Sequence, residues 1–225
     1  YLMWDRPYGN GGSRKYLISS CDQSLKRTGL EYFDIFYSHR YDPNTPIEET
    51  MQALVDIVRS GKALYAGISN YPADKQQECY DYLRAAHVPC VIGQYKASIL
   101  APETLIKNLP VAKENGSGFI CYSPLAQGLL TDRYLHGIPA GSRASKDVYL
   151  YPEQITKEAI ERAQRLGHIA AQRGQTLAQM AISWLLAKDV TSVIVGASSI
   201  KQLEDNLQAI KNISFTEEEL NTIKA

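Results

Sequence analysis

The sequence predicts a parallel α/β fold built from five strand–helix units. Five short apolar runs, typical of buried strands, each end on polar or small residues; they cover residues 33–37, 63–68, 89–93, 118–121 and 192–195. The stretches between these runs carry the spacing of amphipathic helices. Because parallel strands all point the same way, the groups at their ends gather on one face of the sheet, where we expect function. Five units are too few to close an eight-stranded barrel.

The first four runs start at Phe33, Ala63, Val91 and Phe119, which are 30, 28 and 28 residues apart. This is the length of a strand, a helix and two loops, and the repeated order gives a parallel sheet through right-handed crossovers. No linker divides the chain, so we expect a single domain over residues 1–225.

The first predicted helix has both a start signal and an end signal in the sequence. Ser13 caps the first helix, in which Leu17, Cys21 and Leu25 recur at every fourth position, and Gly29 ends it.

Three more helices are predicted between residues 45 and 115. Residues 45–48 (Thr-Pro-Ile-Glu) form a capping box with proline at the first helical position, and the helix that follows ends at Gly61. Helical patterns follow at about residues 73–86 and 103–115, and Pro110 weakens the second of them.

Four more helices are predicted in the C-terminal part. Thr156 opens one that ends at Gly174, and the apolar spacing of residues 177–185 marks the next. The spacing of residues 203–210 marks a third, and a capping box at residues 216–219 starts a short tail helix.

Residues 123–155 break the regular spacing and contain several glycines and prolines. A loop this long inside a compact domain is usually functional. Because it leaves the strand that ends at Tyr122, it emerges on the candidate site face. We expect it to cover a cofactor as a lid.

Composition argues against several classes of function. Lys plus Arg and Asp plus Glu number 24 each, so no global field favours nucleic acid or an anionic membrane. No apolar run approaches the length of a membrane span, and we expect no signal peptide. The four cysteines show no metal-ligand spacing and stand in apolar contexts. We therefore expect buried free thiols in a reducing compartment, the cytoplasm.

His39 is the first candidate catalytic residue, since it stands where the first strand gives way to a loop. Taken alone, a histidine at a strand end is more often a hydrogen-bonded structural residue. Ser69, Asn70 and Gln94 follow the next two strands, and their amide and hydroxyl groups suit the carboxamide of a nicotinamide ring. Each of them fits equally well as a partner of nearby backbone. Tyr122 offers a flat face for ring stacking.

The end of the last strand is a candidate phosphate site. Small residues at 196–199 let backbone amides approach an anion, and they lead into a helix whose positions 198, 202, 205 and 206 share one face. An ordinary capped helix start explains the same residues equally well. No G-x-G-x-x-G or Walker A pattern occurs, which argues against Rossmann and P-loop folds.

Together these residues resemble the aldo-keto reductases. The similarity runs in order along the whole chain and rests on His39-Arg-Tyr-Asp-Pro43, Gly67-Ile-Ser-Asn70, Gln94, Tyr122-Ser-Pro-Leu125, Ser142-Arg-Ala-Ser145 and Gly196-Ala-Ser-Ser-Ile-Lys-Gln-Leu-Glu-Asp-Asn206. It is closest to the branch that holds voltage-gated potassium-channel β-subunits and bacterial L-glyceraldehyde-3-phosphate (methylglyoxal) reductases. The resemblance implies a (β/α)8 TIM barrel, of which this chain holds only the later five strand–helix units.

The resemblance also implies an NADPH site and no metal site. Ser69, Asn70 and Gln94 would hold the nicotinamide carboxamide, with Tyr122 against the ring. The pyrophosphate, the adenosine phosphates and the adenine would be contacted by Ser123, Pro124, Leu125, Ala126, Gln127, Arg133, Arg143, Gly196, Ala197, Ser198, Lys201, Gln202, Asp205 and Asn206. Basic groups near a 2′-phosphate favour NADPH over NADH.

Of the family's four catalytic groups, this chain matches only the histidine, His39, which orients the substrate carbonyl. The aspartate, the tyrosine and the lysine belong to earlier barrel strands, and residues 1–4 resemble the loop after the third strand. We assign the proton-donor role to none of the 15 tyrosines.

The leading hypothesis is an NADPH-dependent oxidoreductase that, as an intact protein, reduces small aldehydes of the glyceraldehyde 3-phosphate or methylglyoxal type to alcohols. One alternative is a non-catalytic NADPH-binding regulatory subunit like the channel β-subunits, which typically carry asparagine at the position of His39. Another is an inactive fragment without the catalytic Asp, Tyr and Lys, which would expose sheet edges and apolar core. The expected partner is a small aldehyde, with no nucleic acid and no membrane, and a homo-oligomer stays open.

Overall fold

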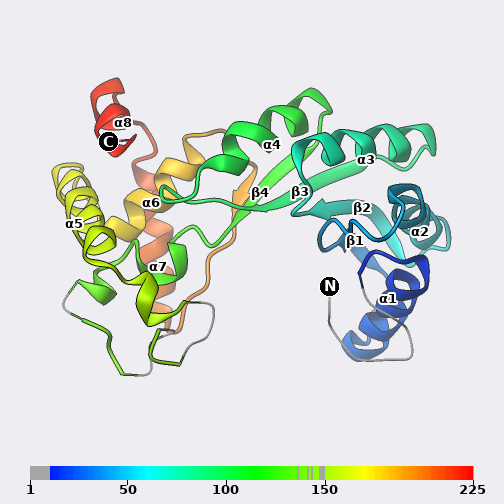
Figure 1. Ribbon diagram of the computed structural model, residues 1–225, viewed down its shortest axis with the longest axis horizontal. Helices are drawn as coiled ribbons and strands as arrows, with labels where there is room; N and C mark the ends of the chain where they lie inside the picture. Colours follow the sequence, from blue (N-terminus) through cyan, green and yellow to red (C-terminus); the bar gives the residue numbers. More distant parts are fainter. Residues whose placement is uncertain (1–10, 136, 141, 143, 147–149, 225) are drawn as a thin grey trace. The chain divides into compact units, whose positions relative to one another are not determined.

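The computed structural model contains five strands that lie in chain order in one sheet (Figure 1). They are β1 (Phe33–Ser38), β2 (Ala63–Ser69), β3 (Cys90–Lys96), β4 (Gly118–Tyr122) and β5 (Ser192–Val193). β1 pairs with β2, and β2 pairs with β3, in parallel. The structure describes residues 11–135, 137–140, 142, 144–146 and 150–224. Its parallel strands alternate with helices, which confirms the predicted α/β fold of five strand–helix units.

Two strands differ from their predicted bounds by two residues or more at one end, and the other three by one residue. β3 runs on to Lys96, so Gln94 lies within the strand and not after its end. The ladder continues there because Ser69 pairs with Gln94 and the backbone N–H of Asn70 donates to the Gln94 carbonyl at 3.2 Å. β5 has only two residues, although residues 192–195 are all favourable in a strand. An apolar run indicates a preference for burial, but it does not determine how far the hydrogen-bonded ladder extends.

The chain forms two compact units. The first holds the described residues up to Tyr95 together with residues 104–120, and the second holds residues 96–103 and the described residues from Cys121 onward. Each unit is described by itself below. The expectation of one domain over residues 1–225 stays a prediction.

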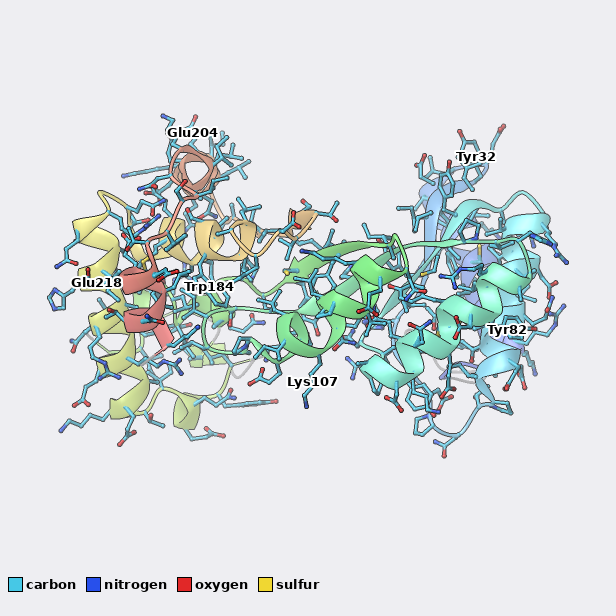
Figure 2. All side chains as sticks on the ribbon, turned by 90° about the horizontal axis from the view of Figure 1, so that it is seen from above. Tyr32, Tyr82, Lys107, Trp184, Glu204 and Glu218 are labelled. Atoms are coloured by element: carbon cyan, nitrogen blue, oxygen red, sulfur yellow. The ribbon has the colours of Figure 1, made fainter. Side chains whose placement is uncertain are left out.

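The first unit contains α1 (Arg14–Thr28), α2 (Ile47–Arg59), α3 (Ala73–Ala85) and most of α4 (Glu103–Glu114). One core cluster packs α2 and α3 against β2, with Met51, Leu54, Val55, Ala66, Ile68, Cys79 and Leu83 all buried. α2 and α3 also share a polar contact, since the Tyr82 hydroxyl donates to Gln52 Oε1 at 2.8 Å (Tyr82 is labelled in Figure 2). This packing fixes the ends of β1 and β2.

The predicted ends of α1 are confirmed. Ser13 Oγ accepts from the Tyr16 backbone N–H at 3.3 Å, as an N-cap does. Gly29 has a φ of +71°, and its N–H donates to the Leu25 carbonyl at 2.9 Å. Glycine adopts this left-handed conformation without a side-chain clash, so it ends the helix cheaply.

The predicted capping box at residues 45–48 is wrong. Pro46 is the N-cap residue of α2, and no side chain bonds to the helix start there. The Thr45 hydroxyl donates instead to Asp42 Oδ2 at 2.8 Å. A buried carboxylate accepts a stronger hydrogen bond than a neutral group, and here it takes the hydroxyl away from the helix. Glu48 and Glu49 in the first turn still favour the positive end of the helix dipole.

The second unit contains α5 (Lys157–Gln172), α6 (Leu177–Leu186), α7 (Ile200–Leu207) and α8 (Glu217–Lys224), with a short 3₁₀ turn at Gln208–Lys211. The predicted capping box of α8 is confirmed, because the Glu219 N–H donates to Thr216 Oγ1 and the Thr216 N–H donates to Glu219 Oε2. Trp184 of α6, labelled in Figure 2, is buried.

The long segment of residues 123–155 has local order in its described part. It holds four 3₁₀ turns, at Ala126–Gly128, Asp132–Tyr134, Ala144–Lys146 and Pro152–Gln154. It also has a small apolar cluster of its own, formed by Tyr134, Ala144 and Leu150. The role of a cofactor-covering lid stays a prediction.

All four cysteines are free and buried, as the sequence predicts. Burial raises the pKa of Cys21 to about 11 and that of Cys121 to about 12. Such thiols stay protonated near neutral pH and are poor nucleophiles. Among the described residues, no helix is long and apolar enough to cross a membrane.

Candidate functional site

Four of the predicted site residues lie together in the first unit, at the ends of β1, β2 and β3. Asn70 connects them: its side-chain Nδ2 donates to the His39 carbonyl at 3.1 Å and to Ser69 Oγ at 2.9 Å. Its backbone N–H donates to the carbonyl of Gln94. Asn70 has a φ of +56°, which is uncommon for a residue with a side chain and typical of functional turns. The predicted convergence of His39, Ser69, Asn70 and Gln94 is therefore present.

The imidazole of His39 is tuned toward its neutral form. Its partial burial lowers its pKa, and the positive charge of Arg40 acts in the same direction. A neutral imidazole has one N–H, which can donate a hydrogen bond to a carbonyl oxygen, and one nitrogen that can accept. This state suits a group that orients a carbonyl, the role that the resemblance implies.

The second unit contains a pocket of about 840 Å³ at the end of β4 and the start of α7. Most residues predicted for the pyrophosphate and adenosine line it: Tyr122, Ser123, Pro124, Leu125, Gln127, Arg133, Gly196, Ala197, Ser198, Gln202, Asp205 and Asn206. Three segments of the chain, within residues 122–133, 176–178 and 194–206, thus supply one concave surface. Pockets of this size suit a cofactor or a drug-sized ligand.

One wall of this pocket is a strained turn after β4. Ser123, Ala126 and Gln127 all have φ values between +45° and +61°. Three such residues in five positions cost energy, which the surrounding structure must offset, and strain of this kind clusters at ligand sites. Gln127 Nε2 donates to Ser123 Oγ at 3.0 Å. Its Oε1 is buried and has no hydrogen-bond partner among the described residues, so this wall holds an acceptor that suits a ligand donor.

The opposite wall is the start of α7. Gln202 Oε1 accepts from both the N–H and the hydroxyl of Ser198, each at 2.9 Å. Ser199 caps the helix by accepting from the Gln202 N–H at 3.2 Å. An anion at this loop would compete with Gln202 for the Ser198 donors. Further along the helix, Gln179 of α6 donates to Asp205 Oδ1 at 2.7 Å and fixes that carboxylate at the pocket.

Some predicted residues do not line the pocket. Ala126 lies in the strained turn but outside the lining, and Lys201 is exposed in the first turn of α7. Arg143 lies outside the described residues. The cofactor contacts of all these residues stay predictions.

The lining also includes residues that the sequence did not single out: Gly128, Thr131, Asp132, Thr176, Leu177, Ala178 and Ile194. Three of them form the start of α6, where Thr176 and Gln179 make a capping box. That Thr-x-x-Gln pattern is visible in the sequence. It marks a helix start, but it carries no signal that this start adjoins the turn after β4.

Comparison with known proteins agrees with these features. The family model described as the aldo/keto reductase family matches residues 2–225. An L-glyceraldehyde 3-phosphate reductase of Escherichia coli (strain K12) is 50% identical over 230 residues, which cover 99% of this chain and 66% of that protein. A probable voltage-gated potassium channel subunit beta of Arabidopsis thaliana is 34% identical, over 93% of this chain and 66% of that protein. The chain thus spans just under two thirds of the length of these relatives.

Among solved structures, a thermostable aldo-keto reductase in complex with the inhibitor epalrestat matches with a TM-score of 0.71 and 26% identity, over 95% of this chain and 66% of that chain. The fold, the sequence motifs and the relatives all indicate the same protein family. This chain belongs to the aldo/keto reductase family, and its five parallel strand–helix units are part of a (β/α)8 barrel.

Proposed function

We propose that the intact protein to which this chain belongs reduces small aldehydes to alcohols with NADPH. The observation that carries the proposal is the pocket of the second unit, which gathers the segments 122–127 and 196–206 on one concave surface. These are the segments in which the family resemblance places the cofactor. The 50% identity to an L-glyceraldehyde 3-phosphate reductase supports a small phosphorylated aldehyde as the substrate class, and the sequence resemblance adds aldehydes of the methylglyoxal type.

The residues present fit a dinucleotide. In the second unit, the buried acceptor Gln127 Oε1 and the donors of Ser198 suit a polar ligand, and Tyr122 supplies a ring for stacking. In the first unit, the amides of Asn70 and Gln94 would hold the nicotinamide carboxamide. The second unit offers Arg133 at the pocket and Lys201 nearby as partners for phosphate.

When bound, the nicotinamide supplies a hydride to the carbonyl carbon of the substrate. His39 would orient the carbonyl oxygen through the N–H of its neutral imidazole, the form that the lowered pKa favours. The proton that completes the alcohol comes from a group that we assign to none of the tyrosines of this chain. His39 therefore acts in positioning and polarising the carbonyl.

Cofactor selectivity tests the phosphate assignment. Lys201→Ala removes a positive charge from the first turn of α7 and is expected to raise the Kd for NADPH about 3- to 10-fold, as for a solvent-exposed charged contact. The Kd for NADH should stay within about twofold, because NADH lacks the 2′-phosphate. Both constants are measured by quenching of protein fluorescence.

Lys211→Ala is the matched control, since it removes the same charge in the same unit but at the end of the 3₁₀ turn Gln208–Lys211 and not at the start of α7. It should change neither constant. No binding of NADPH to the wild-type chain at millimolar concentration contradicts the proposed function.

Turnover by this 225-residue chain is expected to be little or none, because it lacks an assigned proton donor. General acid catalysis typically contributes about 10²- to 10⁴-fold, so its loss is easily measured. The assay follows NADPH absorbance with methylglyoxal and with glyceraldehyde 3-phosphate. Robust turnover that survives repurification and disappears in His39→Ala contradicts this expectation.

A further inference from the structure

The turn that carries His39 is held at three points by a single dipeptide, Asn70–Tyr71. The Asn70 side chain donates to the His39 carbonyl at 3.1 Å. The Tyr71 hydroxyl lies 2.7 Å from Ser38 Oγ, one residue before His39. The Tyr71 ring packs against the ring of Tyr41, two residues after it, with 5.7 Å between centroids. Tyr71 therefore contacts side chains on both sides of His39, and Asn70 bonds to the backbone at His39.

The contact between Ser38 and Tyr71 is shielded from water. Ser38 is 1% exposed and Tyr71 is 2% exposed. Water cannot replace this hydrogen bond if one partner is removed, so its loss leaves a buried polar atom without a partner. Burial also raises the pKa of Tyr71, which keeps its hydroxyl protonated. This tyrosine is suited to holding a turn and unsuited to transferring a proton.

Tyr71 is itself held by a buried polar network. Asn108 Nδ2 donates to the Tyr71 carbonyl at 2.9 Å and to Gln76 Oε1 at 2.7 Å. Gln76 is fully buried, and its Nε2 donates to the Tyr80 hydroxyl at 2.9 Å. Fully satisfied buried networks of this kind rigidify their surroundings. The Asn70–Tyr71 dipeptide is thus anchored to α3 and α4 on one side and contacts the His39 turn on the other.

We propose that Tyr71 is a positioning residue for His39, which sets the place of the imidazole relative to the carboxamide-binding side chain of Asn70. The proposal rests on the proposed function, in which His39 orients the carbonyl and Asn70 binds the cofactor. A donor must lie within about 0.5 Å of its productive place to stabilise a reacting carbonyl, so a fixed turn has catalytic value. No proton or electron moves through Tyr71.

The test compares Tyr71→Phe with Tyr80→Phe in the 225-residue chain without cofactor. Each substitution removes one buried hydroxyl; that of Tyr80 bonds to Gln76 in the network, and only that of Tyr71 contacts the His39 turn. Proton NMR follows the imidazole of His39, one of only four histidines, assigned with His39→Gln. We expect Tyr71→Phe to shift the His39 resonance and to move its titration midpoint toward that of free imidazole, because the turn loosens. Tyr80→Phe should leave both unchanged.

Stability serves as the second measurement. Each variant is expected to change the unfolding equilibrium constant about 3- to 10-fold, the effect of one hydrogen bond. If Tyr71→Phe fails to fold, Ser38→Ala removes the same hydrogen bond from its other side and should shift the His39 resonance in the same way. In the double variant, the two stability effects should be far from additive.

Two results overturn the proposal: an unchanged His39 signal in both Tyr71→Phe and Ser38→Ala, or the same shift in Tyr80→Phe. NADPH titration of the wild-type chain separates the two proposals. If NADPH does not bind while Tyr71→Phe still moves the His39 signal, the proposed function fails and the positioning of His39 by Tyr71 stands.

Discussion

Replacing Arg173 by alanine is expected to lower the free energy of unfolding of the second unit by about 3 kcal/mol, in the range for breaking a buried charged pair. The Arg173 side chain is only 3% exposed. Its guanidinium donates to Glu219 Oε2 at 2.8 Å and to the Ser214 carbonyl at 2.8 Å. It also lies 3.6 Å from the centroid of the Phe215 ring. One side chain thus fixes the segment that leads into α8 through several charge-assisted hydrogen bonds.

Urea unfolding followed by circular dichroism measures this effect. Arg173→Lys keeps the charge but loses the planar fork of donors, so it should recover less than half of the stability. Arg165→Ala within α5, the helix that Arg173 follows as the C-cap residue, is the matched control, because Arg165 is exposed, and it should stay within about 0.5 kcal/mol of wild type. A similar value for Arg173→Ala contradicts the argument.

Most of the fold follows from local signals in the sequence. Caps such as Ser13, Thr156 and the Thr216–Glu219 box are satisfied within one helical turn, so the sequence contains everything that decides them. The capping box at Thr45 fails for the opposite reason. Its hydroxyl is taken by Asp42, whose orientation depends on Gly12, 30 residues away. Such a competition is not visible in a short window of sequence.

The candidate site also contains residues that the sequence predicts and residues that it does not. The turn after β4 and the start of α7 are continuous motifs, and the sequence predicts most of their residues at the pocket. Thr176 and Tyr71 could not be found in this manner. Thr176 reaches the pocket only because α6 packs beside α7, and the role of Tyr71 depends on its contact with Ser38, 33 residues earlier. Tertiary contacts decide both.

The apolar side of α7 illustrates a further limit. Ile200, Leu203, Leu207 and Ile210 follow helical spacing, and all are between 43% and 77% exposed. The spacing correctly predicts a helix. The helical spacing of apolar residues indicates that one face of the helix prefers burial, but it does not indicate which part of the molecule covers that face.

Replacing Asp42 by alanine is expected to cost the first unit about 3 kcal/mol, because it removes a buried carboxylate with three donors. Asp42 Oδ2 accepts from the Gly12 N–H and from Thr45 Oγ1, both at 2.8 Å. Its Oδ1 accepts from the Asn44 N–H at 3.0 Å. The carboxylate therefore joins the loop before α1 to the loop after β1. Without it, three donors lose their partner, and one of them, the Gly12 N–H, is buried.

The charge of Asp42 gives this prediction a pH dependence with a definite sign. Burial alone would raise the pKa of Asp42, but the hydrogen bonds from Gly12, Thr45 and Asn44 outweigh it and leave the pKa below the ordinary value of 3.8. A group whose folded pKa is lowered contributes stability that is present above its unfolded pKa and is lost as pH falls through its folded pKa. The stability difference between wild type and Asp42→Asn should thus be full at pH 5 to 7 and shrink below about pH 4. Asp34→Asn, at an exposed position on β1, should show no such difference at any pH in urea unfolding. A difference for Asp42→Asn that stays constant down to pH 2.5 would show that shape alone, and not the ionised carboxylate, holds the two loops together.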